Sequence, residues 1–197
     1  MKNLFYFLLF LGLANAGLFQ CKSKEKLEDE VFEETKPAKI DFDKASVQIM
    51  DTLSAQLLGR WNLQQVEFVL KPYNREGSVK KDTIFRDFAV LEIQNISRES
   101  PKYPGVTGQM VYKDQRWPVR FNLIADATRI IEKKGPHAYT LLDWNFPNGS
   151  RTWKPEELFM KNLGLIGDNY SIELDSDKSM VWKGLNLDVK EIRLKKM

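Results

Sequence analysis

The fold is decided around residues 57–63, where the spacing of apolar residues changes; this stretch reads Leu57-Leu58-Gly59-Arg60-Trp61-Asn62-Leu63. Before it, apolar residues recur at helical spacing, at Val47, Met50, Leu53 and Leu57. That spacing predicts a short amphipathic helix over about residues 44–57, with Asp43 as its N-cap. After Gly59 apolar and polar residues alternate, which indicates a strand with one buried face.

The alternation continues along the rest of the chain and predicts eight strands. Their expected ranges are 59–70, 84–95, 104–113, 116–125, 137–146, 168–174, 178–184 and 188–196. Turn residues of hairpin length separate several of them, such as Asp175-Ser176-Asp177. Pro118 lies inside one range and marks an edge, a bulge or the end of a pairing. One helical insert is expected at residues 155–161, because it begins with Pro155 and ends before Gly164.

Many short strands with short connections are typical of an up-and-down barrel or of a sandwich. We expect the barrel, because closure removes the exposed sheet edges that invite aggregation. The predicted fold class is therefore mainly β: an antiparallel up-and-down eight-stranded barrel with a short N-terminal helix and one helical insert. The interior of such a barrel is wide enough for side chains alone or for one small ligand.

The N-terminus has the pattern of an export signal. Lys2 precedes an apolar run at residues 4–13, which is too short to cross a bilayer, since that takes about 20 residues. Cleavage after Ala14-Asn15-Ala16 would release a soluble protein that begins at Gly17. The alternative is Leu18-Phe19-Gln20-Cys21, which resembles the lipobox of bacterial lipoproteins. We favour lipidation of Cys21, because this single cysteine stands at the end of the signal and a polar segment follows it.

The predicted organisation is therefore a signal peptide at 1–20, a flexible charged tether at 21–44 and a barrel domain at 45–197. The formal net charge is +3, and removal of the signal takes away Lys2 alone, which leaves +2. Such a balance favours neither nucleic acid nor a strongly acidic partner. One cysteine and one histidine, His137, cannot form a zinc site, and no catalytic motif is present. We therefore expect no enzyme, no metal and no cofactor.

The Gly59-Arg60-Trp61 triplet, placed after a short helix at the start of the first strand, resembles the lipocalin signature. The chain is similar, over residues 45–197, to the small lipocalin-like domains of bacterial lipoproteins. The resemblance implies that Gly59 lets the chain enter the barrel and that the indole of Trp61 plugs its closed end. It also implies that a basic residue near the end of the domain packs on that indole. Arg193 is the first candidate for this residue and Lys195 the second.

The resemblance leads us to expect a lipid-anchored, non-catalytic protein of the cell envelope that binds a small apolar ligand or a protein partner. The alternative is a filled barrel that serves as a structural or assembly subunit of a cell-envelope complex. A secreted or periplasmic soluble location remains the alternative to anchoring. A cavity of about 300 Å³ or more would favour the ligand. Trp153, in the connection before the helical insert, is expected at the barrel mouth or at a partner contact, or else packed on that insert.

Overall fold

The computed structural model describes residues 39–72 and 79–197. The predicted signal peptide, the predicted lipidation site Cys21 and most of the predicted tether lie outside these ranges. The helices are α1 (Phe42–Leu57), α2 (Ala127–Glu132) and α3 (Pro155–Asn162), with one 3₁₀ turn at Pro147–Gly149. The strands are β1 (Gly59–Phe68), β2 (Thr83–Arg86), β3 (Val90–Ser97), β4 (Gly105–Tyr112), β5 (Gln115–Asn122), β6 (Ile124–Ala125), β7 (Ala138–Trp144), β8 (Asp168–Ser176), β9 (Ser179–Gly184) and β10 (Val189–Lys196).

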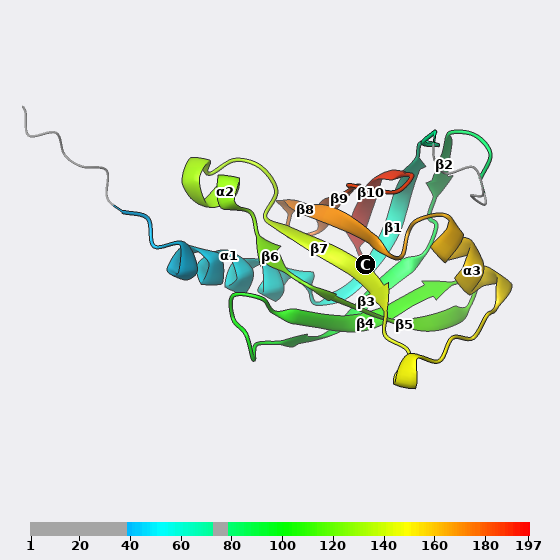
Figure 1. The fold of residues 1–197 in the computed structure, drawn as a ribbon, viewed down its shortest axis with the longest axis horizontal. Coiled ribbons are helices and arrows are strands. Elements are labelled where there is room, and N and C mark those ends of the chain that lie inside the picture. Colours follow the sequence, from blue (N-terminus) through cyan, green and yellow to red (C-terminus); the bar gives the residue numbers. More distant parts are fainter. Residues whose placement is uncertain (1–38, 73–78) are drawn as a thin grey trace, which may run out of the picture. The chain divides into compact units, whose positions relative to one another are not determined.

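Eight of these strands form the wall of a closed barrel, in the order β1-β3-β4-β5-β7-β8-β9-β10 (Figure 1). The barrel closes because β10 pairs with β1, and each pairing is antiparallel. The short strands continue their neighbours: β2 pairs with the end of β1 beyond the stretch that pairs with β3, and β6 pairs with β7 beyond β5. Neighbours in the wall follow the chain, so the predicted up-and-down eight-stranded barrel is confirmed.

Helix α1 leads into β1 and lies across one end of the barrel (Figure 1). Its N-cap is Asp41, whose carboxylate accepts a hydrogen bond from the backbone N–H of Lys44 at 3.0 Å. The prediction of Asp43 as the cap is therefore wrong; Asp43 lies inside the first turn, and the helix begins within the range predicted as tether. The apolar stripe faces the barrel, with Met50, Leu53 and Leu57 buried.

A β-bulge in β1 shifts the alternation that the sequence suggested. Trp61 and Leu63 point inward at the start of the strand, whereas Val66 and Phe68 point inward at its end. The change of phase falls at the register shift opposite β10 between Leu63 and Gln65. The bulge keeps both halves of the strand packed on the core although they differ in phase.

The barrel interior is filled by apolar side chains that belong to one continuous core. Each wall strand contributes a residue that is at most 1% exposed: Val66, Leu91, Met110, Val119, Leu142, Tyr170, Trp182 and Ile192. At the end opposite α1, helix α3 packs against the barrel (Figure 1). Its Phe159 lies 6.4 Å from Phe85 and 6.1 Å from Tyr112, measured between ring centres. The predicted helical insert is thus confirmed as α3, and it covers this end of the barrel.

Candidate functional site

The closed end of the barrel is built around Trp61, which is completely buried. Its indole N–H donates a hydrogen bond of 2.7 Å to the carbonyl oxygen of Leu57, at the end of α1. This satisfies one of the carbonyl groups that a helix leaves unpaired at its C-terminus. Gly59, two residues earlier, has a φ of +118°, a conformation that side chains with a Cβ rarely adopt. The glycine therefore makes the sharp turn from α1 into β1.

The residue that covers Trp61 is Lys196, and the predictions of Arg193 and Lys195 are wrong. The ammonium nitrogen of Lys196 lies 5.1 Å from the centre of the indole ring, and it donates a hydrogen bond of 2.8 Å to the carbonyl oxygen of Gln56. Arg193 is exposed and forms an ion pair with Glu191 at 2.8 Å. The reason is the alternation of β10, in which Ile192 and Leu194 are buried and Arg193 and Lys195 point to the outside.

The packed interior bears directly on ligand binding. A void large enough for a small molecule would leave the surrounding side chains accessible to a water molecule. Large aromatic side chains instead fill the interior, and Trp61, Trp117, Trp182 and Tyr170 are each less than 2% exposed. The hydroxyl of Tyr170 donates to the carbonyl oxygens of Gly164 and Leu165, and burial raises its pKa well above the usual value. A binding site is therefore expected on the outer surface of the barrel and not in its interior.

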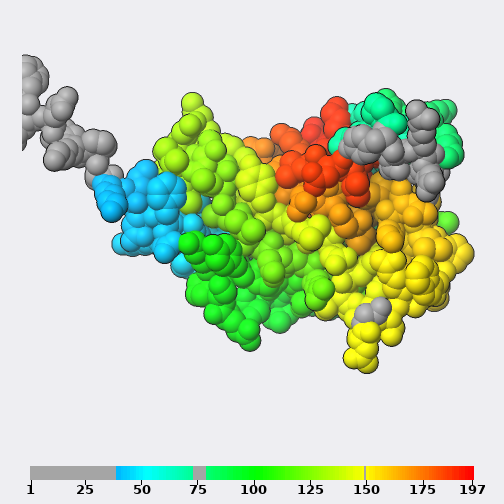
Figure 2. Space-filling model, viewed as in Figure 1, coloured from blue at the N-terminus to red at the C-terminus, as the bar shows by residue number. Residues whose placement is uncertain are grey.

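Trp153 lies on the connection between β7 and α3, which projects from the surface (yellow in Figure 2). Its side chain is 64% exposed, and its φ is +55°. A left-handed backbone at a bulky residue is an outlier that costs on the order of 1–3 kcal/mol. The guanidinium carbon of Arg151 lies 5.4 Å from the centre of the indole. The alternative that Trp153 packs on the helical insert does not fit this exposure.

A buried carboxylate holds this loop in place. Glu157, in the first turn of α3, is 1% exposed. One of its oxygens, Oε2, accepts hydrogen bonds from the backbone N–H groups of Thr152 and Trp153, both at 2.9 Å, and from the hydroxyl of Thr152 at 2.5 Å. The Thr152 hydroxyl also accepts from the indole N–H of Trp117, at 3.4 Å. Glu157 of α3, and Trp117 of the barrel core through Thr152, therefore hold the strained conformation of Trp153 in place.

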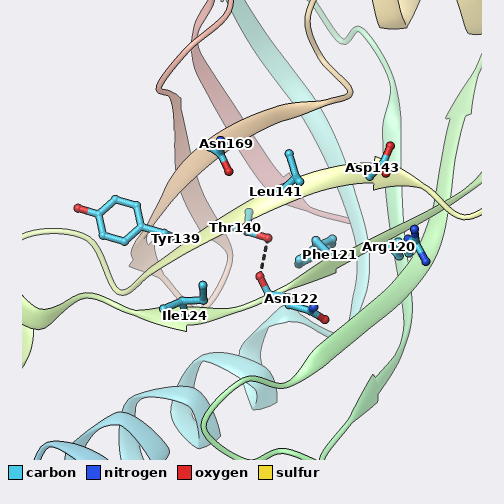
Figure 3. Close-up of a pocket in the computed structure, with 9 residues that line it drawn as sticks. All are labelled: Arg120, Phe121, Asn122, Ile124, Tyr139, Thr140, Leu141, Asp143 and Asn169. Atoms are coloured by element: carbon cyan, nitrogen blue, oxygen red, sulfur yellow. Dashed lines mark hydrogen bonds between the residues drawn. The ribbon is translucent and has the colours of Figure 1, made fainter.

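A second feature of the outer surface is a pocket of about 470 Å³ between β5 and β7 (Figure 3). It is open to solvent, and its lining combines polar and apolar side chains. The lining residues are Arg120, Phe121, Asn122, Ile124, Tyr139, Thr140, Leu141, Asp143 and Asn169. No sequence motif marks this pocket, because its members come from four strands and become neighbours only when β5 and β6 pair with β7 and β7 pairs with β8.

His137 has a structural role in the barrel wall. Its Nδ1 atom accepts a hydrogen bond of 3.2 Å from the backbone N–H of Leu174. Desolvation lowers the pKa of the imidazole below its usual 6.5, with a smaller contribution of the same sign from the charge of Arg129. Both effects favour the neutral ring, which is the form that accepts this hydrogen bond.

Residues 39–72 and 79–197 contain no cluster of three or more His, Cys, Asp or Glu side chains suited to hold a metal ion. Within the same ranges, no helix has the length and the apolar character that a membrane crossing requires. Comparisons with protein-family models, with curated proteins and with solved structures found no match to this chain.

Proposed function

We propose that this protein is an exported, lipid-anchored, lipocalin-like barrel that works without catalysis as a subunit of a cell-envelope assembly. The packed interior carries this proposal. Both ends of the barrel are covered, by α1 and by α3, and the inward side chains of the wall are at most 1% exposed at its centre. Between the two functions expected from the sequence, this arrangement favours contact with a partner over an apolar ligand held inside the barrel.

The loop around Trp153 is the surface that we assign to the protein partner. An exposed indole in a strained conformation lowers the stability of the free protein, and a bound partner would offset that cost by burying the ring. Tryptophan and arginine are enriched among the residues that dominate binding energy at protein interfaces, and Arg151 lies over Trp153. The anchoring of the loop by Glu157 reduces the ordering entropy that binding would otherwise cost.

Native electrophoresis of solubilised membranes from the producing cells tests this assignment. We expect the wild-type protein to migrate in an assembly larger than its monomer, and Trp153→Ala to migrate as the monomer. Leu185→Ala is the matched control, because Leu185 is also an exposed apolar residue on a connection, at 48% exposure. The proposal fails when the wild type is already monomeric, or when Trp153→Ala stays in the larger assembly.

A photo-cross-linking side chain placed at position 153 and, separately, at position 185 identifies the contact directly. We expect a defined cross-linked polypeptide from position 153 and none from position 185. Equal products at the two positions would contradict a specific contact at Trp153.

Membrane attachment is tested at Cys21. We expect the wild-type protein in the detergent phase of a phase-separation experiment and Cys21→Ser in the aqueous phase. A wild-type protein that partitions into the aqueous phase and begins at Gly17 would contradict lipid anchoring and would leave the partner contact to be judged by its own experiments.

A further inference from the structure

The barrel wall opens locally between β5 and β7. Val119 and Arg120 pair with Trp144 and Asp143, and farther along the same two segments of chain Ile124 and Ala125 pair with Tyr139 and Ala138. The two paired stretches keep one register, so the strands part and meet again without a bulge. Between them the hydroxyl of Thr140 donates a hydrogen bond of 2.9 Å to the carbonyl oxygen of Asn122 (Figure 3). A side chain thus takes a position that a strand ladder usually gives to a backbone N–H.

The pocket over this opening has the size of a small-molecule site. Its volume of about 470 Å³ lies within the usual range of about 300–1,000 Å³ for such sites. Figure 3 shows polar side chains from both borders around it: Arg120 and Asn122 come from β5, Asp143 from β7 and Asn169 from β8. The strands of the barrel position all four of them, so the arrangement does not depend on a loop.

Several of these polar groups have no partner within the described part of the chain. The side chains of Arg120, Asn122 and Asn169 make no hydrogen bond or ion pair there. Arg120 faces Asp143 across the ladder, yet the two do not form an ion pair; the Asp143 carboxylate instead accepts a hydrogen bond from the backbone N–H of Trp144 at 2.8 Å. These groups are therefore available to a ligand.

The charges of the pocket decide which ligand it suits. Arg120 and Asp143 carry opposite charges side by side, so neither a bare anion nor a bare cation gains from the site as a whole. Asn122 and Asn169 each offer one acceptor and two donors. Such a set matches a neutral molecule with several hydroxyl groups, because each hydroxyl both donates and accepts.

The same pocket offers apolar surface for the carbon skeleton of such a molecule. Ile124 and Leu141 line the pocket and are 49% and 48% exposed. The ring of Tyr139 lies at its border (Figure 3), and desolvation together with the nearby Asp126 carboxylate raises the pKa of its phenol. Tyr139 therefore stays protonated and adds one donor beside an apolar ring face.

We propose that the pocket between β5 and β7 binds the ring of a neutral saccharide. The ring hydroxyls form hydrogen bonds with the guanidinium of Arg120, the amides of Asn122 and Asn169 and the carboxylate of Asp143. The C–H surface of the ring packs on Ile124, Leu141 and Tyr139. This site is separate from the Trp153 loop and does not rest on the partner function proposed above.

Nuclear magnetic resonance of the full chain, in a detergent without a sugar headgroup, tests this proposal. The probes are maltotriose, cellotriose and chitotriose, with acetate as the anion, methylammonium as the cation and a blocked dipeptide as the peptide control. We expect at least one saccharide to shift the side-chain amide signals of Asn122 and Asn169 saturably. Asn122→Ala and Asn169→Ala should each weaken that binding tenfold or more. Asn162→Ala is the matched control, since Asn162 is an exposed asparagine on α3.

Three outcomes overturn the proposal. One is the absence of a saturable shift with any of the saccharides up to about 100 mM, a concentration well above the dissociation constant of even a weak site. Another is a response to acetate, methylammonium or the dipeptide that equals or exceeds the response to the saccharides. The third is an equal loss of binding in Asn162→Ala, which would place the saccharide elsewhere on the protein. The native electrophoresis of Trp153→Ala reads out the partner contact independently of these results.

Discussion

Lys196 covers the indole of Trp61, with its ammonium nitrogen 5.1 Å from the ring centre, and the two residues face each other across the β1–β10 ladder. Both side chains also bind the end of α1: Trp61 donates to the carbonyl oxygen of Leu57, and Lys196 donates to that of Gln56. A positive charge at a helix C-terminus is favourable, and the last turn of α1 has no basic residue of its own. One contact thus joins the first strand, the last strand and the helix that closes the barrel.

This contact predicts a strong coupling between the two residues. Trp61→Ala should lower the free energy of unfolding by about 3–5 kcal/mol, as for other large buried aromatics. Lys196→Ala should cost about 1–2 kcal/mol, because it loses the cation–π contact and the hydrogen bond to α1. The double variant should cost less than the sum of the two, since removal of the ring removes the surface on which Lys196 packs. Denaturant unfolding of the four proteins measures the coupling, and strict additivity would contradict it.

Arg193→Ala is the control for that experiment. Arg193 is exposed and pairs with Glu191 on the outer face of β10, so the change should cost no more than about 0.5 kcal/mol. A larger loss for Arg193→Ala than for Lys196→Ala would restore the assignment that the sequence suggested.

At the closed end of the barrel, the sequence predicts the central residues but not the bulge in β1. Gly59 and Trp61 are identified by the resemblance of the Gly59-Arg60-Trp61 triplet to the lipocalin signature, and the change of period places this triplet at the start of the first strand. The alternation of β10 favours Lys196 over Arg193, because Ile192 and Leu194 define the inward face of the strand and Lys196 continues that face two residues later. The bulge in β1 had no such signal, because it arises from the fit between neighbouring strands and not from one strand alone.

Gly59→Ala should lower the free energy of unfolding by about 1–2 kcal/mol, because its φ of +118° is disfavoured for residues with a Cβ. Space is not the reason, since an added Cβ would lie 3.4 Å from the nearest atom, in the side chain of Lys196. Thermal unfolding measures the loss. An alanine variant as stable as the wild type would show that the backbone at this junction relaxes without cost.

His137 predicts a loss of stability in mild acid. Its pKa in the folded protein is lowered, by desolvation first and by Arg129 second, while Glu173 acts in the opposite direction. Below pH 6.5, the ordinary pKa of the imidazole, the unfolded chain therefore binds more protons at His137 than the folded protein does. The free energy of unfolding falls as the pH drops from 6.5 toward the lower pKa of the folded protein. His137→Asn keeps an acceptor for the N–H of Leu174 and should flatten this fall. Melting temperatures between about pH 7.5 and about pH 5 test the effect, and equal slopes for the two proteins would contradict it.

The outer-surface sites were only partly predictable. The sequence indicates an exposed Trp153, because this residue lies in a polar connection. It does not indicate that Glu157 anchors the loop. Glutamate in the first turn of a helix is common, and only the fold reveals that this one is buried. Helix α2 also escaped prediction, although Asp126 caps it by accepting from the N–H groups of Thr128 and Arg129.

Glu157→Ala should be among the most damaging changes at the Trp153 loop. It removes the acceptor of two backbone N–H groups and one hydroxyl in a buried position, which should cost about 3 kcal/mol. Glu157→Gln keeps an oxygen for these donors and should cost about half as much. Chemical denaturation compares the two variants, and equal losses would indicate that the charge, and not the acceptor geometry, holds the loop.

Trp153 itself should matter little for stability, in contrast to Trp61. Its ring is 64% exposed, and its φ of +55° suits glycine better than any other residue. Trp153→Gly should therefore change the free energy of unfolding by no more than about 0.5 kcal/mol, because relief of backbone strain offsets the lost contact with Arg151. Trp153→Val should cost about 1–2 kcal/mol, since a β-branched residue fits this conformation worst. Both variants should lose the larger assembly in native electrophoresis, although only one of them is destabilised. If Trp153→Gly instead loses several kcal/mol, the indole is part of the fold, and its exposure is no argument for a partner.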